Sequence, residues 1–161
     1  MSQVDVLGLG EIAAIEFADI VAGTFVPGPN ELPIHLGDGS FIDVWFSLKL
    51  ANRYSLHWER QAIDGTIYRH DNAPHDWWRS VATFPDHFHN GREDAVQESQ
   101  LGQDPPSALR DFLTFARNKL RGQVSSGIWT PRTHLLDGLT GALPAGRGSQ
   151  AHGSVDRSAG P

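Results

Sequence analysis

The chain has 161 residues and contains no cysteine. Disulfide bonds and thiolate ligands are therefore excluded, so histidine and carboxylate side chains would have to hold any metal ion. No apolar run approaches the ~20 residues of a membrane-spanning helix, and the first residues lack the basic-then-apolar pattern of a secretory signal. These absences predict a cytoplasmic protein without a membrane segment. A hydrophobic fraction of 39% is enough for one domain with its own core.

Positive charge is also scarce. The net charge of −6 argues against a general nucleic-acid-binding protein, because such proteins neutralise phosphates with Lys and Arg. Residues 1–48 hold seven acids and no Lys or Arg, whereas residues 49–80 hold five basic residues. An anionic substrate would therefore bind to the middle of the chain. The acidic N-terminal part either binds a basic partner protein or is a solvated surface without a partner.

Period-two alternation of apolar residues predicts an antiparallel meander of about four to five strands. In the first hairpin, the alternation favours a three-residue loop over residues 38–40, which pairs Leu36 with Ile42 and Ile34 with Val44. An Asp64-Gly65 turn joins the third strand to the fourth. The predicted strands cover residues 32–36, 42–46, 53–60 and 66–70, with a short fifth strand within 95–100.

Two helices complete a predicted α+β fold, one in the N-terminal segment over residues 11–22 and one near the C-terminus. Asp104 caps the second helix and Pro105 occupies its first position, and Gly122 is expected to end it. Its apolar stripe consists of Leu109, Phe112, Leu113, Ala116 and Leu120, which would pack on the sheet. Residues 123–161 are rich in Gly, Ser, Ala and Pro and predict a disordered tail, so that residues 1–122 form the folded domain.

Imidazole and carboxylate groups gather in the middle of the chain, and this density is the main functional signal. The group consists of His57, Glu59, His70, Asp71, His75, His87 and His89. Histidine titrates near neutral pH, so a cluster of this kind indicates acid–base or metal chemistry. His87 and His89 would point to the same side if they lie in a strand.

Three interpretations of the cluster remain open. In the first, a zinc-type ion is held by Asp71, His75, His87 and His89. In the second, His75, His87 or His89 cleaves RNA without metal: one imidazole takes the proton of a ribose 2′-hydroxyl and another protonates the leaving oxygen, while Asp71 orients an imidazole and Arg69 or Arg60 stabilises the phosphorane. In the third, the histidines only bond to turn backbones.

Further residues are predicted to contact the substrate. They are Asn72, Arg60, His57 and Trp77, the last because an exposed indole can stack on a base. A structural role is the alternative for Asn72, which suits a turn, and for the tryptophans, which suit a core. His87 lies in a polar segment, so we expect a His87→Ala change to remove activity with little change in melting temperature.

The chain contains, in this order, the strings DGSFIDVWFSL, RYSLHWER, DGTIYRHDNAPH and FPDHFHNG. Together they resemble the core of the TumE family of bacterial toxins, over residues 32–120. The resemblance implies that residues 1–122 are a growth-inhibiting toxin of a type II toxin–antitoxin pair. The implied partner is a cognate antitoxin, a helix-turn-helix DNA-binding protein of the TumA type.

The positions most characteristic of the family correspond to Arg69, Asp71, Asn72, Pro74 and His75, with His87 and His89 behind them. At position 70 many relatives carry an aromatic residue, so the resemblance does not imply a catalytic role for His70. The preferred mechanism is metal-independent RNA cleavage, with no cofactor. The alternatives are a nuclease that depends on a divalent metal such as zinc, and a non-enzymatic toxin that blocks its target by binding.

Overall fold

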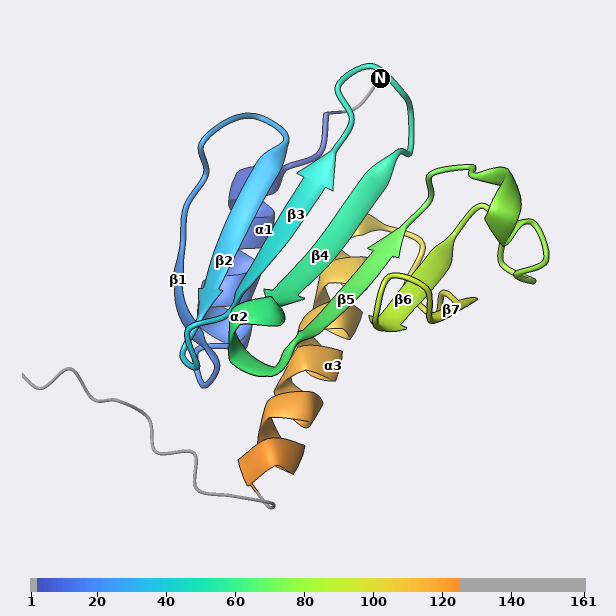
Figure 1. Ribbon diagram of the computed structural model, residues 1–161. Helices are drawn as coiled ribbons and strands as arrows, with labels where there is room; N and C mark the ends of the chain where they lie inside the picture. Colours follow the sequence, from blue (N-terminus) through green and yellow to red (C-terminus); the bar gives the residue numbers. More distant parts are fainter. Residues whose placement is uncertain (1–2, 125–161) are drawn as a thin grey trace, which may run out of the picture.

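The computed structural model of the protein describes residues 3–124 as one antiparallel sheet with helices on one face (Figure 1). Within this part of the chain the sheet has seven strands, and each strand pairs with the next one in sequence. The strands are β1 (Val21–Thr24), β2 (Glu31–Leu36), β3 (Phe41–Phe46), β4 (Tyr54–Arg60), β5 (Thr66–Asp71), β6 (His87–Gly91) and β7 (Val96–Glu98). The predicted α+β meander is confirmed, but four to five strands was too few.

The two added strands are β1 and β6, and both lack the alternation of buried and exposed residues seen in β2, β3 and β4. β1 has a burial pattern without a fully buried residue, because it forms one edge of the sheet. β6 begins with three consecutive buried residues, His87, Phe88 and His89. A strand that is covered on both faces gives no period-two signal.

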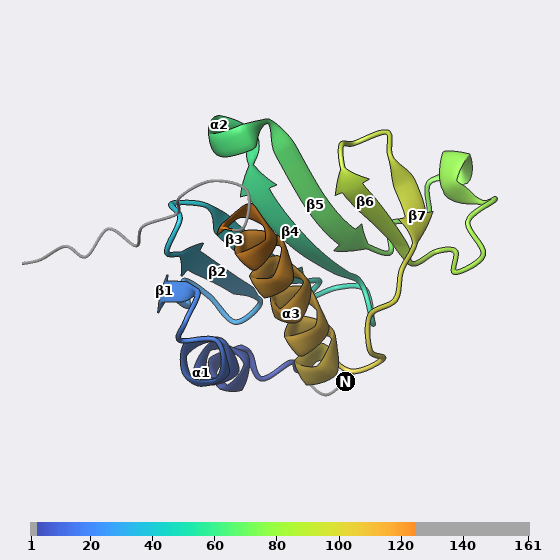
Figure 2. The same ribbon diagram turned by 90° about the horizontal axis from the view of Figure 1, so that it is seen from below.

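Two long helices, α1 (Val6–Glu16) and α3 (Pro105–Val124), lie side by side on the same face of the sheet (Figure 2). Helix α1 begins earlier than the predicted range of 11–22, since the Asp5 carboxylate caps it by accepting from the Gly8 amide at 3.0 Å. It ends at Glu16, and the chain then turns into β1. A short helix, α2 (Gln61–Asp64), joins β4 to β5, and a 3-10 turn, η1 (Asp76–Trp78), follows β5.

Helix α3 agrees with the prediction at its start but not at its end. The Ser107 amide donates to the Asp104 carboxylate at 3.0 Å, which confirms the cap. Leu109, Phe112, Leu113 and Ala116 are completely buried against the sheet, as the apolar stripe predicted. Gly122 does not end the helix, which continues to Val124; a glycine inside a helix costs only about 1 kcal/mol.

The first hairpin is shifted by two residues from its predicted register. Ile34 pairs with Ile42 and Leu32 with Val44, and the loop is Gly37–Gly39 because the Leu36 amide donates to the Ser40 carbonyl at 2.9 Å. Gly39 takes a φ of +90°, a conformation that favours glycine. A shift of two residues keeps every side chain on its own face, so the hydrophobic pattern could not distinguish the two registers.

No helix within residues 3–124 has the length and apolar character needed to cross a membrane. Gln123 and Val124 of the predicted tail belong to α3. Residues 125–161 of that tail lie outside the described residues.

Candidate functional site

The histidines and Asp71 are placed by three neighbouring strands, β4, β5 and β6. Residues that face each other in an antiparallel pair project to the same side of the sheet. Pairing across these strands therefore forms two adjacent rows, Ser55–Asp71–His87 and His57–Arg69–His89. His70 alternates to the other side, where it contacts Phe112 of α3. Both rows consequently lie on the face that α1 and α3 leave uncovered.

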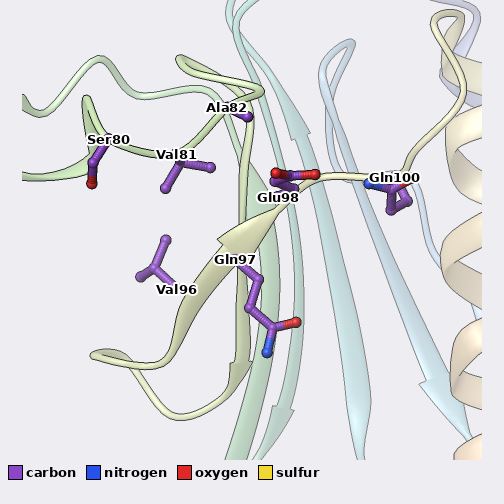
Figure 3. A pocket seen from close by; sticks show the side chains of 7 residues that line it. All are labelled: Ser80, Val81, Ala82, Val96, Gln97, Glu98 and Gln100. Carbon is purple, nitrogen blue, oxygen red and sulfur yellow. The ribbon is translucent and has the colours of Figure 1, made fainter.

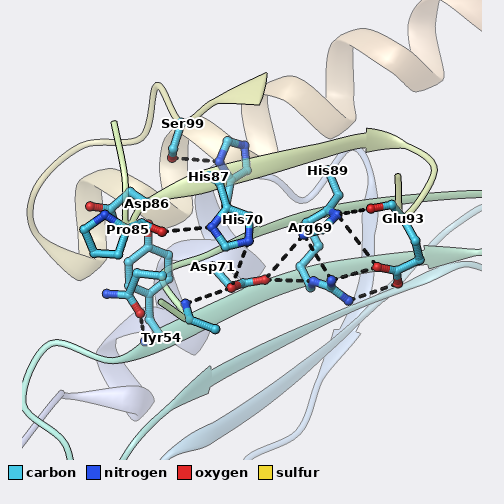
Figure 4. Close-up of polar contacts among 12 residues, drawn as sticks. Tyr54, Arg69, His70, Asp71, Pro85, Asp86, His87, His89, Glu93 and Ser99 are labelled. Atoms are coloured by element: carbon cyan, nitrogen blue, oxygen red, sulfur yellow. Dashed lines mark hydrogen bonds and ion pairs between the residues drawn. The ribbon is translucent and has the colours of Figure 1, made fainter. Parts of the chain in front are cut away.

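Arg69, Asp71, His87 and His89 meet in one contact group, here called the β5–β6 cluster (Figure 4). The Arg69 guanidinium donates from Nε to Asp71 Oδ2 at 2.9 Å and from Nη2 to His89 Nε2 at 3.1 Å. Glu93, in the turn after β6, accepts from the same guanidinium at 3.0 and 2.8 Å. Arg69 is thus held between two carboxylates and an imidazole.

Backbone carbonyls fix the orientation of both imidazoles. His87 Nδ1 lies 2.8 Å from the Pro85 carbonyl oxygen, and His89 Nδ1 lies 2.7 Å from that of Glu93. A carbonyl only accepts, so each Nδ1 carries the hydrogen and each Nε2 has the lone pair in the neutral ring. Both Nε2 atoms lie near the Asp71 carboxylate, with His87 Nε2 at 3.3 Å from Oδ1 and His89 Nε2 at 3.8 Å from Oδ2.

The two imidazoles are buried even though the rest of this face is open. The side chains of His87 and His89 are 1% and 2% exposed, and Trp78 lies against them with ring centroids 6.1 and 5.8 Å away. Burial lowers the pKa of His89, and the positive charge of Arg69 acts in the same direction. His89 is therefore neutral at neutral pH, as a base or a metal ligand must be.

The burial of His87 contradicts the basis for expecting that a His87→Ala change leaves the melting temperature almost unchanged. That expectation assumed a residue outside the core, whereas His87 is among the largest fully buried side chains of the described residues. Removing its ring would leave a cavity, so a loss of stability is now expected together with the loss of activity.

His70 is separated from the cluster by the sheet itself. Its ring stacks on Phe88 at 4.1 Å between centroids and meets Phe112 edge-on at 5.5 Å, while Nδ1 lies 2.9 Å from Ser99 Oγ. Burial lowers the pKa of His70 to about 3. It is a neutral core histidine, in a position where an aromatic ring would pack equally well.

Three of the four predicted metal ligands are brought together. Donor atoms of Asp71, His87 and His89 all lie within 4.8 Å of one another, and all three residues are buried. His75 is exposed in the segment after β5 and lies outside this group. The two imidazole nitrogens and the carboxylate are a donor set that suits zinc or a similar transition metal.

Two of the predicted substrate contacts, Asn72 and Arg60, are held by contacts within the fold. Asn72 accepts from the Tyr54 amide at 3.1 Å and donates to the Asn52 carbonyl at 2.6 Å, so it ties β5 to the β3–β4 loop. Arg60 lies at the opposite end of β4, where it is 3% exposed and paired with Asp38 and Asp64. A buried guanidinium in that position is not available to a phosphate.

The other two predicted contacts remain accessible. His57 has a side chain that is 24% exposed, and its Nε2 lies 3.3 Å from Glu59. It is the cross-strand neighbour of Arg69, so it borders the cluster on the open side. Trp77 is 77% exposed at the tip of η1. Whether either residue contacts a substrate stays a prediction.

The sequence did not predict that Glu93 contacts Arg69, or that Trp78 packs over the His87 and His89 rings. Glu93 lies in the charged run Arg92-Glu93-Asp94, which reads as a solvated turn, and its carboxylate is 59% exposed. Only the tertiary contact with Arg69 distinguishes it from its neighbours. The tryptophans were assigned to the core or to base stacking, and no sequence signal separates Trp78 from Trp77.

A shallow hollow of about 600 Å³ lies between the segment 80–82 and β7 (Figure 3). It is lined by Ser80, Val81, Ala82, Val96, Gln97, Glu98 and Gln100. None of the residues in the β5–β6 cluster lines it, and its walls bring no group of titratable residues together. The hollow is therefore not the candidate site.

The acidic N-terminal part is less available to a partner than its sequence suggests. Asp5 caps α1, and Glu16, Asp19 and Asp38 form ion pairs with arginines from later in the chain, namely Arg110, Arg117, Arg121 and Arg60. Among residues 3–124, the acids of this N-terminal part that neither cap a helix nor form an ion pair are Glu11, Glu31 and Asp43. Glu31 and Asp43 lie on the uncovered face of the sheet, since Asp43 pairs with His57.

Comparison with known proteins identifies a family. The model of the family described as Toxin TumE matches residues 16–120, which include every strand of the sheet and the whole β5–β6 cluster. Searches of the curated proteins and of the solved structures gave no match.

Proposed function

Because this chain belongs to the TumE toxin family, we propose that it inhibits growth as the toxin of a toxin–antitoxin pair, and that it does so by cleaving RNA at the β5–β6 cluster. The observation that carries the proposed chemistry is the convergence of His87 Nε2, His89 Nε2 and the Asp71 carboxylate beside a guanidinium. Few structural roles require two oriented imidazoles on one carboxylate, whereas acid–base and metal-assisted hydrolysis both do.

The first chemical route needs no metal. One imidazole Nε2 takes the proton of a ribose 2′-hydroxyl, and the 2′-oxygen attacks phosphorus. The bond to the 5′-oxygen breaks as that oxygen receives a proton from the other imidazole, which starts the reaction in its imidazolium form. Arg69 is 26% exposed and borders the open face, so it is placed to bind the phosphate. This route requires the Trp78 segment to move, because RNA must reach two nitrogens that are now buried.

The second route uses a divalent metal, and one observation favours it. The donor atoms of Asp71, His87 and His89 are already within reach of a single ion, which could activate water or the phosphate without direct contact between RNA and the imidazoles. In this route the burial of the histidines does not prevent the reaction, because RNA contacts the metal ion and the histidines only hold that ion.

A toxin family implies an antitoxin as the partner, and we infer that this antitoxin is a helix-turn-helix protein of the TumA type. The uncovered face offers Glu31 and Asp43 to a basic protein surface, on the side of the sheet that also carries Arg69. An antitoxin bound on this face would cover the cluster and so neutralise the toxin directly.

Controlled expression tests the toxin proposal. Expression of this chain alone should arrest growth, and co-expression with the neighbouring antitoxin gene should restore it. Asp71→Asn, which keeps the shape of the side chain, should be expressed without arrest. Unimpaired growth in the presence of abundant, folded wild-type protein would contradict the proposal.

RNA cleavage is tested separately with purified protein and end-labelled RNA. An enzyme should cut a large molar excess of RNA, whereas a toxin that only blocks its target by binding must be present in amounts equal to the target. The assay is run with a chelator and with added Zn²⁺ or Mn²⁺, which separates the two chemical routes. Absence of new RNA fragments in every condition would favour the non-enzymatic binding toxin.

A further inference from the structure

The Nε2 atom of His87 has no hydrogen-bond partner among the described residues, although it is buried. Its other nitrogen is committed to the Pro85 carbonyl, and Nε2 lies 3.3 Å from Asp71 Oδ1 without the alignment of a hydrogen bond. Two acceptor atoms at this distance repel one another, and a buried polar atom without a hydrogen-bond partner destabilises the fold. A positive charge between the two atoms would remove both penalties.

The spacing fits a metal ion better than a shared proton. A hydrogen bond between a charged donor and acceptor draws the heavy atoms to roughly 2.7–2.9 Å, whereas two ligands of a tetrahedral ion, each about 2.1 Å from it, lie roughly 3.4 Å apart. The separations from Asp71 are 3.3 Å to His87 Nε2 and 3.8 Å to His89 Nε2. Both values are close to the spacing between ligands.

We propose that Asp71, His87 and His89 bind one divalent transition-metal ion of the zinc class. Two neutral imidazoles select such metals over Mg²⁺ and Ca²⁺, which prefer oxygen ligands. The two backbone carbonyls on Nδ1 supply the outer hydrogen bonds that orient metal-binding histidines in other proteins. The metal site itself is independent of RNA cleavage; only its role in cutting RNA rests on the proposed function.

Arg69 regulates this site by competing with the ion. Its Nη2 donates to His89 Nε2 at 3.1 Å, on the lone pair that the metal would use. Glu93 binds the guanidinium through two contacts at 3.0 and 2.8 Å, so Arg69 stays nearby after it releases His89. There it would lie beside the metal, with the position and charge to bind a phosphate.

The full chain is purified, stripped of metal with a chelator and titrated with Zn²⁺, Mn²⁺ and Mg²⁺ by calorimetry and by competition with a chromophoric chelator. The wild-type chain is expected to bind one Zn²⁺, with Mg²⁺ far weaker, and to melt at a higher temperature with Zn²⁺ bound. Absence of saturable binding of Zn²⁺ and Mn²⁺ would overturn the proposal.

Variants then identify the ligands. Asp71→Asn and His89→Gln should each weaken Zn²⁺ binding roughly 10- to 100-fold, whereas Arg69→Gln should strengthen it about tenfold by removing the competing charge. His35→Gln is the matched control, since His35 is exposed on the same face two strands from β4. Equal weakening in His35→Gln, or the same loss in His75→Gln, would overturn the assigned ligand set.

These measurements distinguish a failure of the proposed metal site from a failure of the proposed RNA cleavage. A chain that binds one Zn²⁺ but leaves RNA intact keeps the metal site and contradicts RNA cleavage. A chain that cuts RNA equally well with a chelator, and binds no Zn²⁺, keeps the ribonuclease and contradicts the metal site. Thermal unfolding of Asp71→Asn serves as the structural control. A cooperative transition shows that the variant is folded, so a loss of Zn²⁺ binding or of RNA cleavage is not caused by misfolding.

Discussion

Arg60 and Arg69 lie at opposite ends of neighbouring strands, and both bind carboxylates, but their surroundings differ. The Arg60 side chain is 2% exposed, pairs with Asp38 and Asp64 and lies over the Trp58 ring at 4.7 Å. Arg69 is 26% exposed, and its second carboxylate, on Glu93, is 59% exposed. The network around Arg60, here called the closed network, is largely shielded from solvent. The network around Arg69 borders solvent and lies beside a His87 nitrogen that has no hydrogen-bond partner among the described residues.

The difference separates a network whose polar atoms are paired from one with an unpartnered nitrogen. Around Arg60 the polar atoms are paired: Asp38 also accepts from the Ser40 hydroxyl, and Ser40 in turn accepts from the Trp58 indole. Complete pairing is what a buried polar group needs for stability. The His87 nitrogen, beside a carboxylate and a partly exposed guanidinium, lacks such a partner among the described residues.

The largest expected effect comes from breaking the closed network. Arg60→Met leaves the buried Asp38 carboxylate without its partner, which should lower the free energy of unfolding by about 3–5 kcal/mol. Denaturant unfolding measures this, with Arg79→Met as the control because the Arg79–Asp76 pair is exposed. A loss below about 1 kcal/mol would show that the two arginine networks do not differ as described.

An intermediate effect is expected for His87→Ala. The cavity left by the buried ring should lower the free energy of unfolding by roughly 2 kcal/mol, and the melting temperature by several degrees, in metal-free protein. Growth arrest should be lost as well. His87→Gln fills more of the space and should keep most of the stability while remaining non-toxic; a toxic His87→Gln variant would remove this residue from the site.

An effect of similar size, which disappears in acid, is expected for Asp64 in the same network as Arg60. Burial alone would raise the pKa of Asp64, but hydrogen bonds from Thr66 and Arg60 outweigh it and lower the pKa from 3.8 to about 2. A lowered pKa stabilises the fold above pH 3.8, and this contribution is lost as the pH falls toward 2. Asp64→Asn should therefore cost roughly 2 kcal/mol at pH 6 and almost nothing at pH 2; a pH-independent difference between the two unfolding curves would contradict the ion pair.

The smallest effect on stability belongs to Arg69→Gln. Its ion pairs are partly exposed, so the free energy of unfolding should change by less than about 1 kcal/mol, yet growth arrest should be lost because the phosphate contact is gone. Arg92→Gln is the matched control, since Arg92 forms an exposed pair with Asp94 just beyond Glu93. Retained toxicity in Arg69→Gln, at equal protein level, would place the functional site elsewhere.

Much of the fold could be predicted from the sequence because the elements concerned have one solvent-exposed face and one buried face. Strands β2 to β4 alternate, and helix α3 carries its apolar stripe at helical spacing, so local pattern and tertiary burial agree. The two strands that the sequence did not predict, β1 and β6, lack this division into an exposed and a buried face. β6 is buried on both faces, and β1 is an edge strand with no fully buried residue.

The sequence predicted the residue types of the candidate site, but it did not predict which particular residues meet there. The density of His and Asp residues pointed to residues 57–89, and the spacing of His87 and His89 placed them on one face if β6 is a strand. Nothing local distinguished His75 from His87, or Arg60 from Arg69. Each pair consists of the same side chain in a similarly polar segment, and only burial and partners separate them.

By itself, then, the sequence determined the family, the antiparallel meander and the residue types available for chemistry, because these depend on composition and local periodicity. Tertiary structure alone decided which residues meet. Asp71 and His87 are 16 positions apart, and they become neighbours because β5 and β6 pair in one particular register. The Pro85 and Glu93 carbonyls then turn both imidazoles toward the same carboxylate, through contacts that no local pattern encodes.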